Sequence, residues 1–254
     1  MKDTGTTPVI VLAGGLGTRL RAITQDRCPK PMVPVMLDGQ PYPFLEFVLA
    51  AHKARGFDDV VICIGHLGQQ IVDHFADGSR FGIKIRYAEA ETADTGLRVL
   101  QAQAVAKAPV HLVVCGDVYL PIDARAFLRS FATHPDWMVA LASVRSGSAG
   151  AVPNVCADES GTVLAHGDVR AMACEAVGIE GGTLAVREKA LGEFATGKDF
   201  SLTADLFPQL LRARQLGTVF VETDFFDIGT PEGYYRFCSF AAAGGARPLS
   251  LTMD

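Results

Sequence analysis

The 254-residue sequence lacks the features that mark several large classes of protein. Its longest apolar runs fall well short of the roughly 20 residues that a membrane helix needs. The net charge is −5 and no basic stripe is present, so a nucleic-acid partner is not expected. The segment Met1–Pro8 is polar and has no apolar run of the kind found in signal peptides. We therefore expect a cytoplasmic protein with no membrane and no nucleic-acid partner, in which any anionic ligand is held by a few local groups.

The cysteines and histidines form no metal-binding motif. None of the six cysteines belongs to a C-x-x-C pair, which argues against a structural zinc site. Several lie in apolar strand-like segments such as Val60–Ile64 and His111–Cys115. We interpret the cysteines as buried free thiols in a reducing compartment. The six histidines are scattered, and we interpret them as structural or surface residues.

The first part of the chain alternates between two kinds of pattern. Short apolar runs typical of buried strands alternate with helical spacing of apolar residues. This alternation predicts a mostly parallel sheet with helices on both faces. We expect strands over residues 8–13, 59–64, 83–87, 110–115 and 137–144, and helices over 44–55, 69–75, 97–106 and 123–132.

The pattern after residue 145 is richer in short strands. We expect two strand-like pieces in 151–165, a strand over 177–186, a helix over 203–214, a strand over 218–222 and a final helix over 231–242. No Pro-rich or Ser-rich linker and no repeat interrupts the chain. The sequence therefore predicts one domain over residues 1–243, with halves at 8–145 and 146–230, followed by a flexible tail at 244–254.

A glycine-rich segment carries the strongest chemical signal. Residues 12–20 read Leu-Ala-Gly-Gly-Leu-Gly-Thr-Arg-Leu, and Pro29-Lys30-Pro31 follows. Glycines let the backbone approach phosphates and direct N–H groups at them. Arg19 can fork two phosphate oxygens, and Lys30 adds a compact cation. This set predicts a phosphate-binding loop, whereas a glycine-rich turn without a ligand would not need both cations.

Two better-known phosphate-binding motifs do not fit. A P-loop needs Gly-Lys-Ser/Thr after four intervening residues, and that pattern is absent. A dinucleotide-binding fingerprint needs a third glycine, where this chain has Leu20, and an acidic residue closing the second strand, which ends instead at Ile64-Gly65-His66. A hydride-transferring dehydrogenase is therefore disfavoured.

Taken with Gly116-Asp117 and the segment Phe226-Asp227-Ile228-Gly229-Thr230-Pro231, the glycine-rich motif resembles the signature of the sugar-1-phosphate nucleotidylyltransferases. The resemblance runs in the correct order over roughly residues 8–240. Residues 227–235 are most similar to the heptose 1-phosphate guanylyltransferase branch. The resemblance implies a Rossmann-like, mostly parallel α/β sheet of the nucleotide-diphospho-sugar transferase type, with a nucleotide-binding half and a small sugar-side lobe.

The resemblance also implies an activity. The chain would join a nucleoside monophosphate from a nucleoside triphosphate, with GTP favoured, to a sugar 1-phosphate, with heptose favoured. It would release pyrophosphate, use Mg²⁺ and be compatible with a homodimer. A rival interpretation is a catalytically weak homologue that binds nucleotides or sugar nucleotides as a regulatory subunit.

Roles follow residue by residue from the same resemblance. Arg19 and Lys30 hold the phosphates as catalytic cations, and Asp117 and Asp227 are the metal carboxylates. The position of Asp117 after a buried strand agrees with this, because ligands bind at the carboxyl ends of strands in open α/β sheets. The implied nucleotide-binding residues are Leu12, Ala13, Gly14, Gly15, Gly17, Thr18, Asp94, Thr95 and Gly96. The implied sugar-binding residues are Gly150, Glu180, Gly181 and Gly182.

The sequence departs from the family pattern in two segments. Residues 93–98 read Ala-Asp-Thr-Gly-Leu-Arg where the family commonly has Leu-Gly-Thr-Gly/Ala-Gly-Ala. Asp94 either accepts hydrogen bonds from the N1 and N2 donors of guanine, marks a different nucleotide or is a solvated turn residue. On the sugar side, Glu180 replaces an asparagine, and Asp168-Val169 replaces a Glu-Lys pair whose lysine meets the sugar phosphate. Arg170, next in sequence, is a candidate substitute for that cation.

Overall fold

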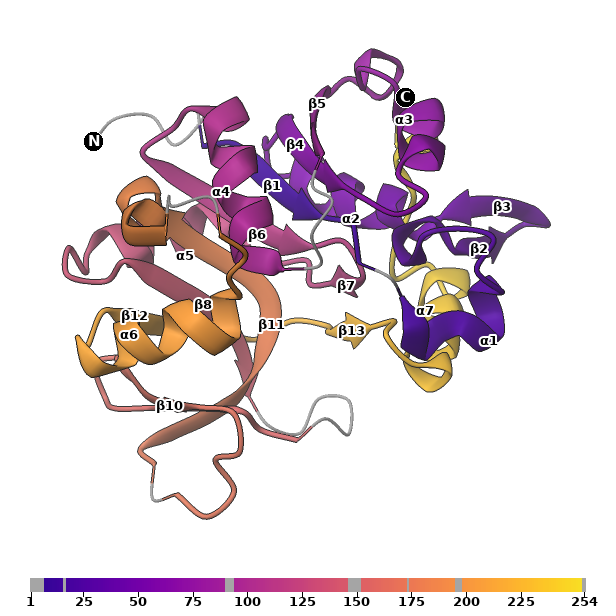
Figure 1. Ribbon diagram of the computed structural model, residues 1–254. Helices are drawn as coiled ribbons and strands as arrows, with labels where there is room; N and C mark the ends of the chain where they lie inside the picture. The colour runs from indigo at the N-terminus through magenta and orange to yellow at the C-terminus, as the bar shows by residue number, and fades with distance from the viewer. Residues whose placement is uncertain are drawn as a thin grey trace.

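Strands from both halves of the chain form one mixed sheet (Figure 1). The computed structural model describes residues 7–15, 17–89, 94–145, 152–172, 174–194 and 198–252. Within these ranges the sheet has nine strands. They are β1 (Val9–Leu12), β4 (Asp59–Ile64), β5 (Lys84–Glu89), β6 (Val110–Cys115), β8 (Val139–Arg145), β9 (Val155–Ala157), β10 (Val163–His166), β11 (Ala176–Arg187) and β12 (Leu216–Val221).

The parallel part of the sheet places three strand ends at one edge. Strand β1 lies between β4 and β6 and runs parallel to both, with Val9 opposite Val60 and Leu112. Strand β5 extends the parallel set beyond β4. Beyond β6, β11 is antiparallel to β6 and to β8, and β12 runs parallel to β8. The loops that follow β1, β4 and β6 therefore meet at the same edge, where ligands bind in sheets of this kind.

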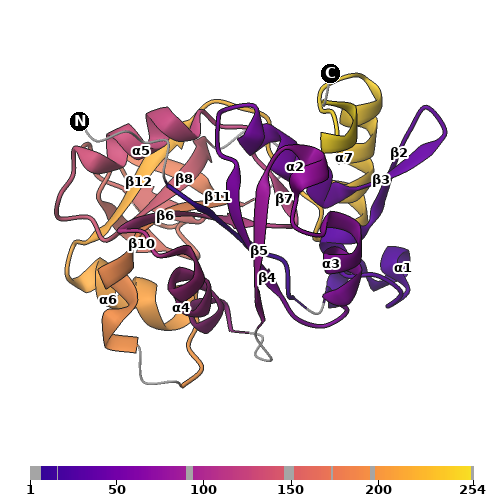
Figure 2. The same cartoon turned by 90° about the horizontal axis from the view of Figure 1, so that it is seen from above.

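Helices cover both faces of the sheet (Figure 2). Alternate strand residues divide the interior into two cores, because successive side chains of a strand point to opposite faces. Val9 and Val11 pack with α2, α3, α5 and α7, whereas Ile10 packs with α4 and α6. The helices are α1 (Arg21–Thr24), α2 (Phe44–Lys53), α3 (Gln69–Phe75), α4 (Thr95–Ala106), α5 (Ala124–Ala132), α6 (Phe207–Arg212) and α7 (Pro231–Ala242).

Short elements connect these layers. Two small antiparallel sheets pair β2 (Pro34–Leu37) with β3 (Gln40–Pro43), and β7 (Val118–Tyr119) with β13 (Phe226–Asp227). The short helical turns are η2 (Thr18–Leu20), η3 (Lys30–Met32), η4 (Ser79–Phe81), η5 (Glu188–Phe194), η6 (Leu202–Leu206) and η7 (Leu249–Leu251). No helix in the described ranges is both long enough and apolar enough to cross a membrane.

The predicted fold class is confirmed, and most elements fall where the sequence pattern placed them. Strands β4 and β6 and helices α3 and α7 have the predicted bounds. The single helix expected over 203–214 is instead a π-helical turn, η6, followed by the shorter α6. Pro208, which has no N–H to donate, lies at the start of α6 and suits a first-turn position.

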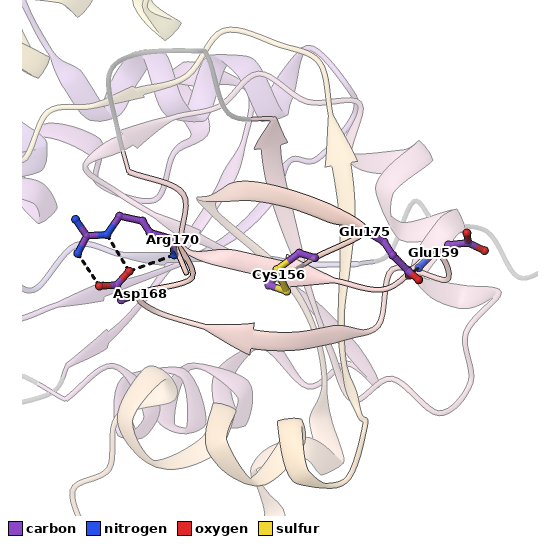
Figure 3. Close-up of a disulfide and its surroundings, with 6 residues drawn as sticks. Cys156, Glu159, Asp168, Arg170 and Glu175 are labelled. Carbon is purple, nitrogen blue, oxygen red and sulfur yellow. Dashed lines mark hydrogen bonds and ion pairs between the residues drawn. A yellow bond between two sulfur atoms is a disulfide. The ribbon is translucent and has the colours of Figure 1, made fainter. Parts of the chain in front are cut away.

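The interpretation of every cysteine as a free thiol is wrong, because Cys156 and Cys174 form a disulfide with their Cα atoms 5.6 Å apart. Cys156 lies on β9 opposite Val177 of β11, and Cys174 lies just before β11 begins. The antiparallel pairing of β9 with β11 thus brings the two sulfurs together. Figure 3 shows the disulfide at Cys156 and, to one side of it, the contact of Asp168 with Arg170. The free cysteines are Cys28, Cys63, Cys115 and Cys238.

The segment after α7 is packed in its described part, residues 244–252, so the expectation of a flexible tail is wrong there. Ala246 and Leu249 are buried in the same core as α2. Ser250 donates from its backbone N and from Oγ to Oε2 of Glu46, at 2.9 and 2.7 Å. Ala246 and Leu249 therefore pack beside α2, a contact that the amino-acid pattern after residue 243 did not predict.

Candidate active site

A cavity of about 150 Å³ opens at the carboxyl edge of β1 and β6. It gathers residues from four separated parts of the chain, as expected for a site assembled from the loops of an open α/β sheet. Most of its lining residues belong to the segments that the sequence singled out. They are Leu12, Ala13, Gly14, Gly15, Lys30, Pro31, Thr95, Arg98, Cys115 and Asp117.

The glycines of the loop after β1 have different surroundings. A Cβ at Gly14 would overlap Nη1 of Arg98 and lie 2.6 Å from its Cζ, so this position must be glycine for the arginine to fit. Gly15 is exposed, and nothing within 4 Å would meet a Cβ there. Gly17 has φ +65°, which suits glycine, and it precedes η2, where Thr18 and Arg19 are exposed. The open backbone at Gly15 is thus the part of the loop that a ligand can approach most closely.

Lys30 and Asp117 meet inside this cavity. Lys30 Nζ lies 2.6 Å from Asp117 Oδ2, and both side chains are largely shielded from solvent. Pro29 and Pro31 flank Lys30 and are buried, which fixes the backbone of η3. On the other side, the backbone N–H of Gly116 donates to Leu12 O at 2.9 Å. The charged pair is therefore mounted on two constrained segments.

Asp117 and Asp227 are brought together by the small sheet of β7 and β13. Asp227 lies opposite Val118, and the N–H of Ile228 donates to the Asp117 carbonyl at 3.1 Å. The carboxylate of Asp227 accepts the N–H of Gly229 at 2.6 Å. Thr230 then caps α7 by accepting the N–H of Gly233. The motif over residues 226–231 is therefore a strand, a turn and a helix start that present one carboxylate.

The thiol of Cys115 reports the charge of this region. Burial raises its pKa well above the ordinary value, and the carboxylates of Asp117, Glu180 and Asp227 raise it further, while Lys30 lowers it. The negative charges of three carboxylates are thus close enough to Cys115 to disfavour its thiolate. In the part of the chain that the structure describes, no group of three His, Cys, Asp or Glu side chains is arranged to hold a metal ion.

Arg19 lies beside the turn that carries Asp227. A Cβ at Gly229 would be 2.7 Å from Asp227 Oδ1 and 3.2 Å from Arg19 Nη2. The guanidinium therefore reaches from η2 to the end of β13 and stands outside the cavity lined by Lys30. Arg19 thus lies near the turn of Asp227, whereas Lys30 contacts Asp117.

The start of α4 supplies one wall of the cavity. Thr95 lines it, and its Oγ1 accepts the N–H of Leu202 at 3.2 Å. Gly96 is buried, donates its N–H to Phe200 O at 3.0 Å and has no room for a Cβ against the Phe200 ring. The structure thus gives Gly96 a packing role away from the cavity lining. Asp94 is half-buried at the N-cap of α4.

The predicted sugar-side residues are partly assembled. Gly181 and Gly182 form a bulge in β11, and a Cβ at Gly182 would lie 3.3 Å from Cβ of Cys115. Glu180 Oε2 lies 2.7 Å from His166 Nε2, and the Glu180 N–H donates to Asn154 Oδ1 at 2.8 Å. These contacts place residues 180–182 behind the cavity wall. The predicted residue Gly150 lies outside the described residues.

Arg170 is paired with Asp168 at the surface in this structure. Its Nε and Nη2 donate to Asp168 at 2.9 and 2.6 Å, with both side chains more than 60% exposed (Figure 3). The intervening Val169 is buried. The arginine proposed from the sequence as a substitute cation is thus engaged by its own neighbour at the surface.

The sequence interpretation overlooked three residues near this site. Arg98 and Cys115 line the cavity, and His166 contacts Glu180. Arg98 stands four residues after Asp94, a spacing that places two side chains on one face of a helix and was the only signal available. Cys115 directly precedes Gly116-Asp117, but an apolar strand ending in cysteine is more typical of a core.

The mixed sheet, whose strands β1, β4 and β6 run parallel, carries a glycine-rich loop, a lysine and two aspartates at its carboxyl edge and has the nucleotide-diphospho-sugar transferase fold. Residues 8–163 match the Nucleotidyl transferase family, and the chain belongs to that family. This confirms the family resemblance found in the sequence.

Several relatives are similar over most of this chain. The D-glycero-alpha-D-manno-heptose 1-phosphate guanylyltransferase of Campylobacter jejuni is 29% identical over 229 residues, covering 90% of this chain and 97% of that protein. The UTP–glucose-1-phosphate uridylyltransferase of Synechocystis sp. is 27% identical over 248 residues. This chain spans only 61% of its length. The crystal structure of HddC from Yersinia pseudotuberculosis has a TM-score of 0.76 at 24% identity, covering 92% and 98% of the two chains, and shares the fold.

Proposed function

We propose that this chain transfers a nucleoside monophosphate from a nucleoside triphosphate to a sugar 1-phosphate and releases pyrophosphate. The observation that carries the proposal is that the pairing of β7 with β13 brings Asp227 next to Asp117, which contacts Lys30 in the cavity beside the glycine-rich loop. The printed names of the relatives, which include guanylyltransferases and uridylyltransferases of sugar 1-phosphates, support the same reaction class.

The phosphates are assigned to the β6 side of the cavity. Lys30, Asp117 and Cys115, which ends β6, line the cavity together with Gly15, and Arg19 stands next to Asp227. Backbone N–H groups and cations at a glycine-rich turn favour phosphate oxygens. Arg19 and Lys30 would hold the triphosphate and neutralise the charge that develops as pyrophosphate leaves.

The residues present also fit Mg²⁺. This ion prefers one or two carboxylates together with phosphate oxygens and water, and Asp117 and Asp227 are the two carboxylates at this edge. Bound there, Mg²⁺ would draw phosphate oxygens together and neutralise part of their charge. Lys30 Nζ lies 2.6 Å from Asp117 Oδ2, so a bound ion would share this carboxylate with the lysine.

The chain's own residues have little covalent chemistry to perform. The attacking oxygen of a sugar 1-phosphate is already ionised at neutral pH, so a general base is unnecessary. In-line attack on the α-phosphorus then depends on positioning and on charge neutralisation. The backbone of Lys30 is fixed between two prolines, and the carboxylate of Asp227 is held by the N–H of Gly229. Both groups are therefore in place before substrate arrives.

We propose further that GTP and a heptose 1-phosphate are the preferred substrates. Two relatives are heptose 1-phosphate guanylyltransferases, at 29% and 28% identity, and HddC has been solved with GMP-PN. Asp94 is half-buried at the start of α4, one residue from the cavity-lining Thr95. A carboxylate there can accept the N1 and N2 hydrogens of guanine together, a pair of donors that adenine lacks.

Replacing Asp94 by alanine should raise the KM for GTP and narrow the gap between GTP and ATP. A site that pairs buried polar groups with a ligand rejects analogues lacking those groups by factors on the order of 10⁴. Competition among the four triphosphates measures the gap in the variant and in the unmodified chain. A clear preference of the unmodified chain for CTP, UTP or dTTP would reject the guanine assignment and leave the reaction class intact.

The reaction class itself is tested by a grid of nucleoside triphosphates against sugar 1-phosphates, with pyrophosphate release as the readout. The rival interpretation is a weakly catalytic homologue that only binds nucleotides. The ion pair of Lys30 with Asp117 favours this rival, because the lysine competes with a metal ion for the carboxylate. Turnover with at least one pair of substrates supports the enzyme. Nucleotide binding without pyrophosphate release from any pair would support the rival.

A further inference from the structure

Arg98 occupies an unusual position in the cavity wall. It lies in the first turns of α4, is only 5% exposed and lines the cavity with Gly14 and Thr95. Its guanidinium fills the space where a side chain at residue 14 would begin, since a Cβ there would overlap Nη1. The loop glycine at position 14 is therefore shaped around this arginine, whereas Gly15 beside it is open.

The surroundings of Arg98 fix its place. Cys63 Sγ, at the end of β4, lies 3.5 Å from the Arg98 carbonyl. Two residues earlier, Gly96 is bonded to Phe200, which holds the start of α4 against the neighbouring segment. Burial lowers the pKa of Arg98, while the nearby Cys63 and Asp94 raise it. An arginine keeps its charge under such conditions, so a cation is held at a defined point of the wall.

Arg98 and the catalytic groups stand on different sides of the loop after β1. A Cβ at Gly14 would touch both Arg98 and the N–H of Gly65, which follows β4. Lys30, Cys115 and Asp117 lie on the side of β6, and β6 and β4 flank β1 on opposite edges. If the phosphates lie with Lys30 and Asp117, the side with Arg98 receives the other end of the nucleotide.

We propose that Arg98 reads the base of the nucleotide by donating its N–H groups to a carbonyl-bearing edge, and that residue 14 is glycine so that the guanidinium can reach it. The inference rests on the proposed function. The fork of an arginine matches the O6 and N7 acceptors of guanine. Uracil and thymine carry the O4 carbonyl at the equivalent place, whereas adenine and cytosine present an amino donor there, so adenine and cytosine are the bases that Arg98 rejects.

Binding of the four nucleoside monophosphates tests this assignment without requiring turnover. Equilibrium dialysis of GMP, CMP, UMP and AMP is compared for the unmodified chain, Arg98→Met and Arg98→Lys. In Arg98→Met, the preference for GMP and UMP over AMP and CMP should fall by about tenfold to a hundredfold, the range of one bidentate base contact, with the binding of AMP and CMP unchanged. Arg129→Met, an exposed arginine of α5, is the matched control and should keep the preference.

The alternative outcomes separate the possible roles. An equal loss of affinity for all four monophosphates, restored by Arg98→Lys, would make Arg98 a phosphate anchor and overturn the proposal. An unmodified chain without any preference over AMP would also overturn it. If Arg98→Met does not fold, as judged by circular dichroism, Arg98→Lys decides, because lysine keeps the charge and loses the fork. Base preference without pyrophosphate release in the substrate grid would reject the proposed reaction and leave this inference standing.

The contact between Gly14 and Arg98 gives an independent test. Gly14→Ala should displace the guanidinium and reduce the base preference as Arg98→Met does. In an Arg98→Ala background, the same change should have no further effect on the preference, since the space is then empty. Gly192→Ala, at an exposed glycine away from the cavity where a Cβ meets nothing within 4 Å, should keep the base preference. Full preference in a folded Gly14→Ala protein would contradict the proposal.

Discussion

At the scale of single residues, Arg19 is the phosphate-binding candidate that the cavity does not include. It is exposed and stands against the turn of Asp227 and Gly229. Arg19→Ala should lower the rate of pyrophosphate release by about 10²–10³, the usual cost of removing one preorganised stabilising contact, with the melting temperature unchanged. The measurement is single-turnover pyrophosphate release. Arg21→Ala, in the next turn and paired with Asp26, is the control, and equal rates for the two variants would exclude the role.

The two aspartates make a paired prediction. Asp117→Asn and Asp227→Asn each keep the shape of the side chain and remove a charge that Mg²⁺ needs, so both should shift the half-saturating Mg²⁺ concentration upward. Asp117→Asn additionally loses its ion pair with Lys30. Titration of activity with Mg²⁺ is the test, and Asp224→Asn, exposed near β13, is the control. An unchanged half-saturation for either variant would mean that this residue is not a ligand.

The residues of this site differ in how far the sequence could predict them. Asp117 and Lys30 stand in motifs whose local pattern implies their chemistry, and the structure brings them within 2.6 Å. Arg98 could not be found in this way, because its importance depends on a close approach to Gly14 across the fold. Gly96 looked like part of a ligand-binding loop, yet its missing side chain serves the packing of Phe200.

At the scale of elements, the disulfide joins β9 to the residue just before β11. It closes a loop with a sequence separation of 18 residues, and a loop of about 15 residues corresponds to roughly 3 kcal/mol of stabilisation. Dithiothreitol should therefore lower the free energy of unfolding of the unmodified chain by about 2–4 kcal/mol. Urea unfolding followed by fluorescence measures the difference.

Variants give this prediction its control. Cys156→Ser should be less stable and insensitive to dithiothreitol, whereas Cys28→Ser, a free thiol elsewhere, should respond as the unmodified chain does. Titration of thiols in denaturant without reductant should find only the free cysteines Cys28, Cys63, Cys115 and Cys238. Six reactive thiols would show that the bond does not form.

Elements of different length were predictable to different degrees. Long apolar strands such as β4 and β6 carry enough pattern to fix their bounds. The strands β7 and β13 have two residues each, too few to show any alternation, and they exist because their partner is present. The hairpin of β2 and β3 contains three prolines, which argue against a strand unless it lies at an edge. Such pairings follow from tertiary contacts and not from local preference.

At the scale of the whole molecule, Glu46 connects three distant parts of the chain. The buried carboxylate lies 2.7 Å from His74 Nε2 of α3 and accepts two hydrogen bonds from Ser250 near the C-terminus. Burial raises the pKa of Glu46, but the hydrogen bonds from His74 and Ser250 outweigh this and hold it below its ordinary value. Glu46→Gln should cost about 1–3 kcal/mol of stability at pH 7, as expected for a disrupted buried network.

The effect of pH on this variant has a defined sign. Because the native pKa of Glu46 lies below the unfolded one, its stabilisation is present above about pH 4.3 and is lost as the pH falls through the native pKa. The stability difference between Glu46→Gln and the unmodified chain should shrink in urea titrations at successively lower pH. Glu232→Gln, exposed on α7, should show no such trend. A difference that stays constant down to pH 3 would contradict this assignment.

The pairing of β7 with β13 also has a consequence for the order in which the molecule matures. Asp117 belongs to the middle of the chain and Asp227 to its last part, so the two carboxylates meet only when a contact of high sequence separation forms. Such contacts close late, because the loop between them must first lose its entropy. A nascent chain still short of β13 carries the glycine-rich loop and Lys30 but only one carboxylate. Synthesis must therefore pass residue 227 before Asp117 and Asp227 can come together. An unfinished chain that ends before residue 227 has only one of the two carboxylates.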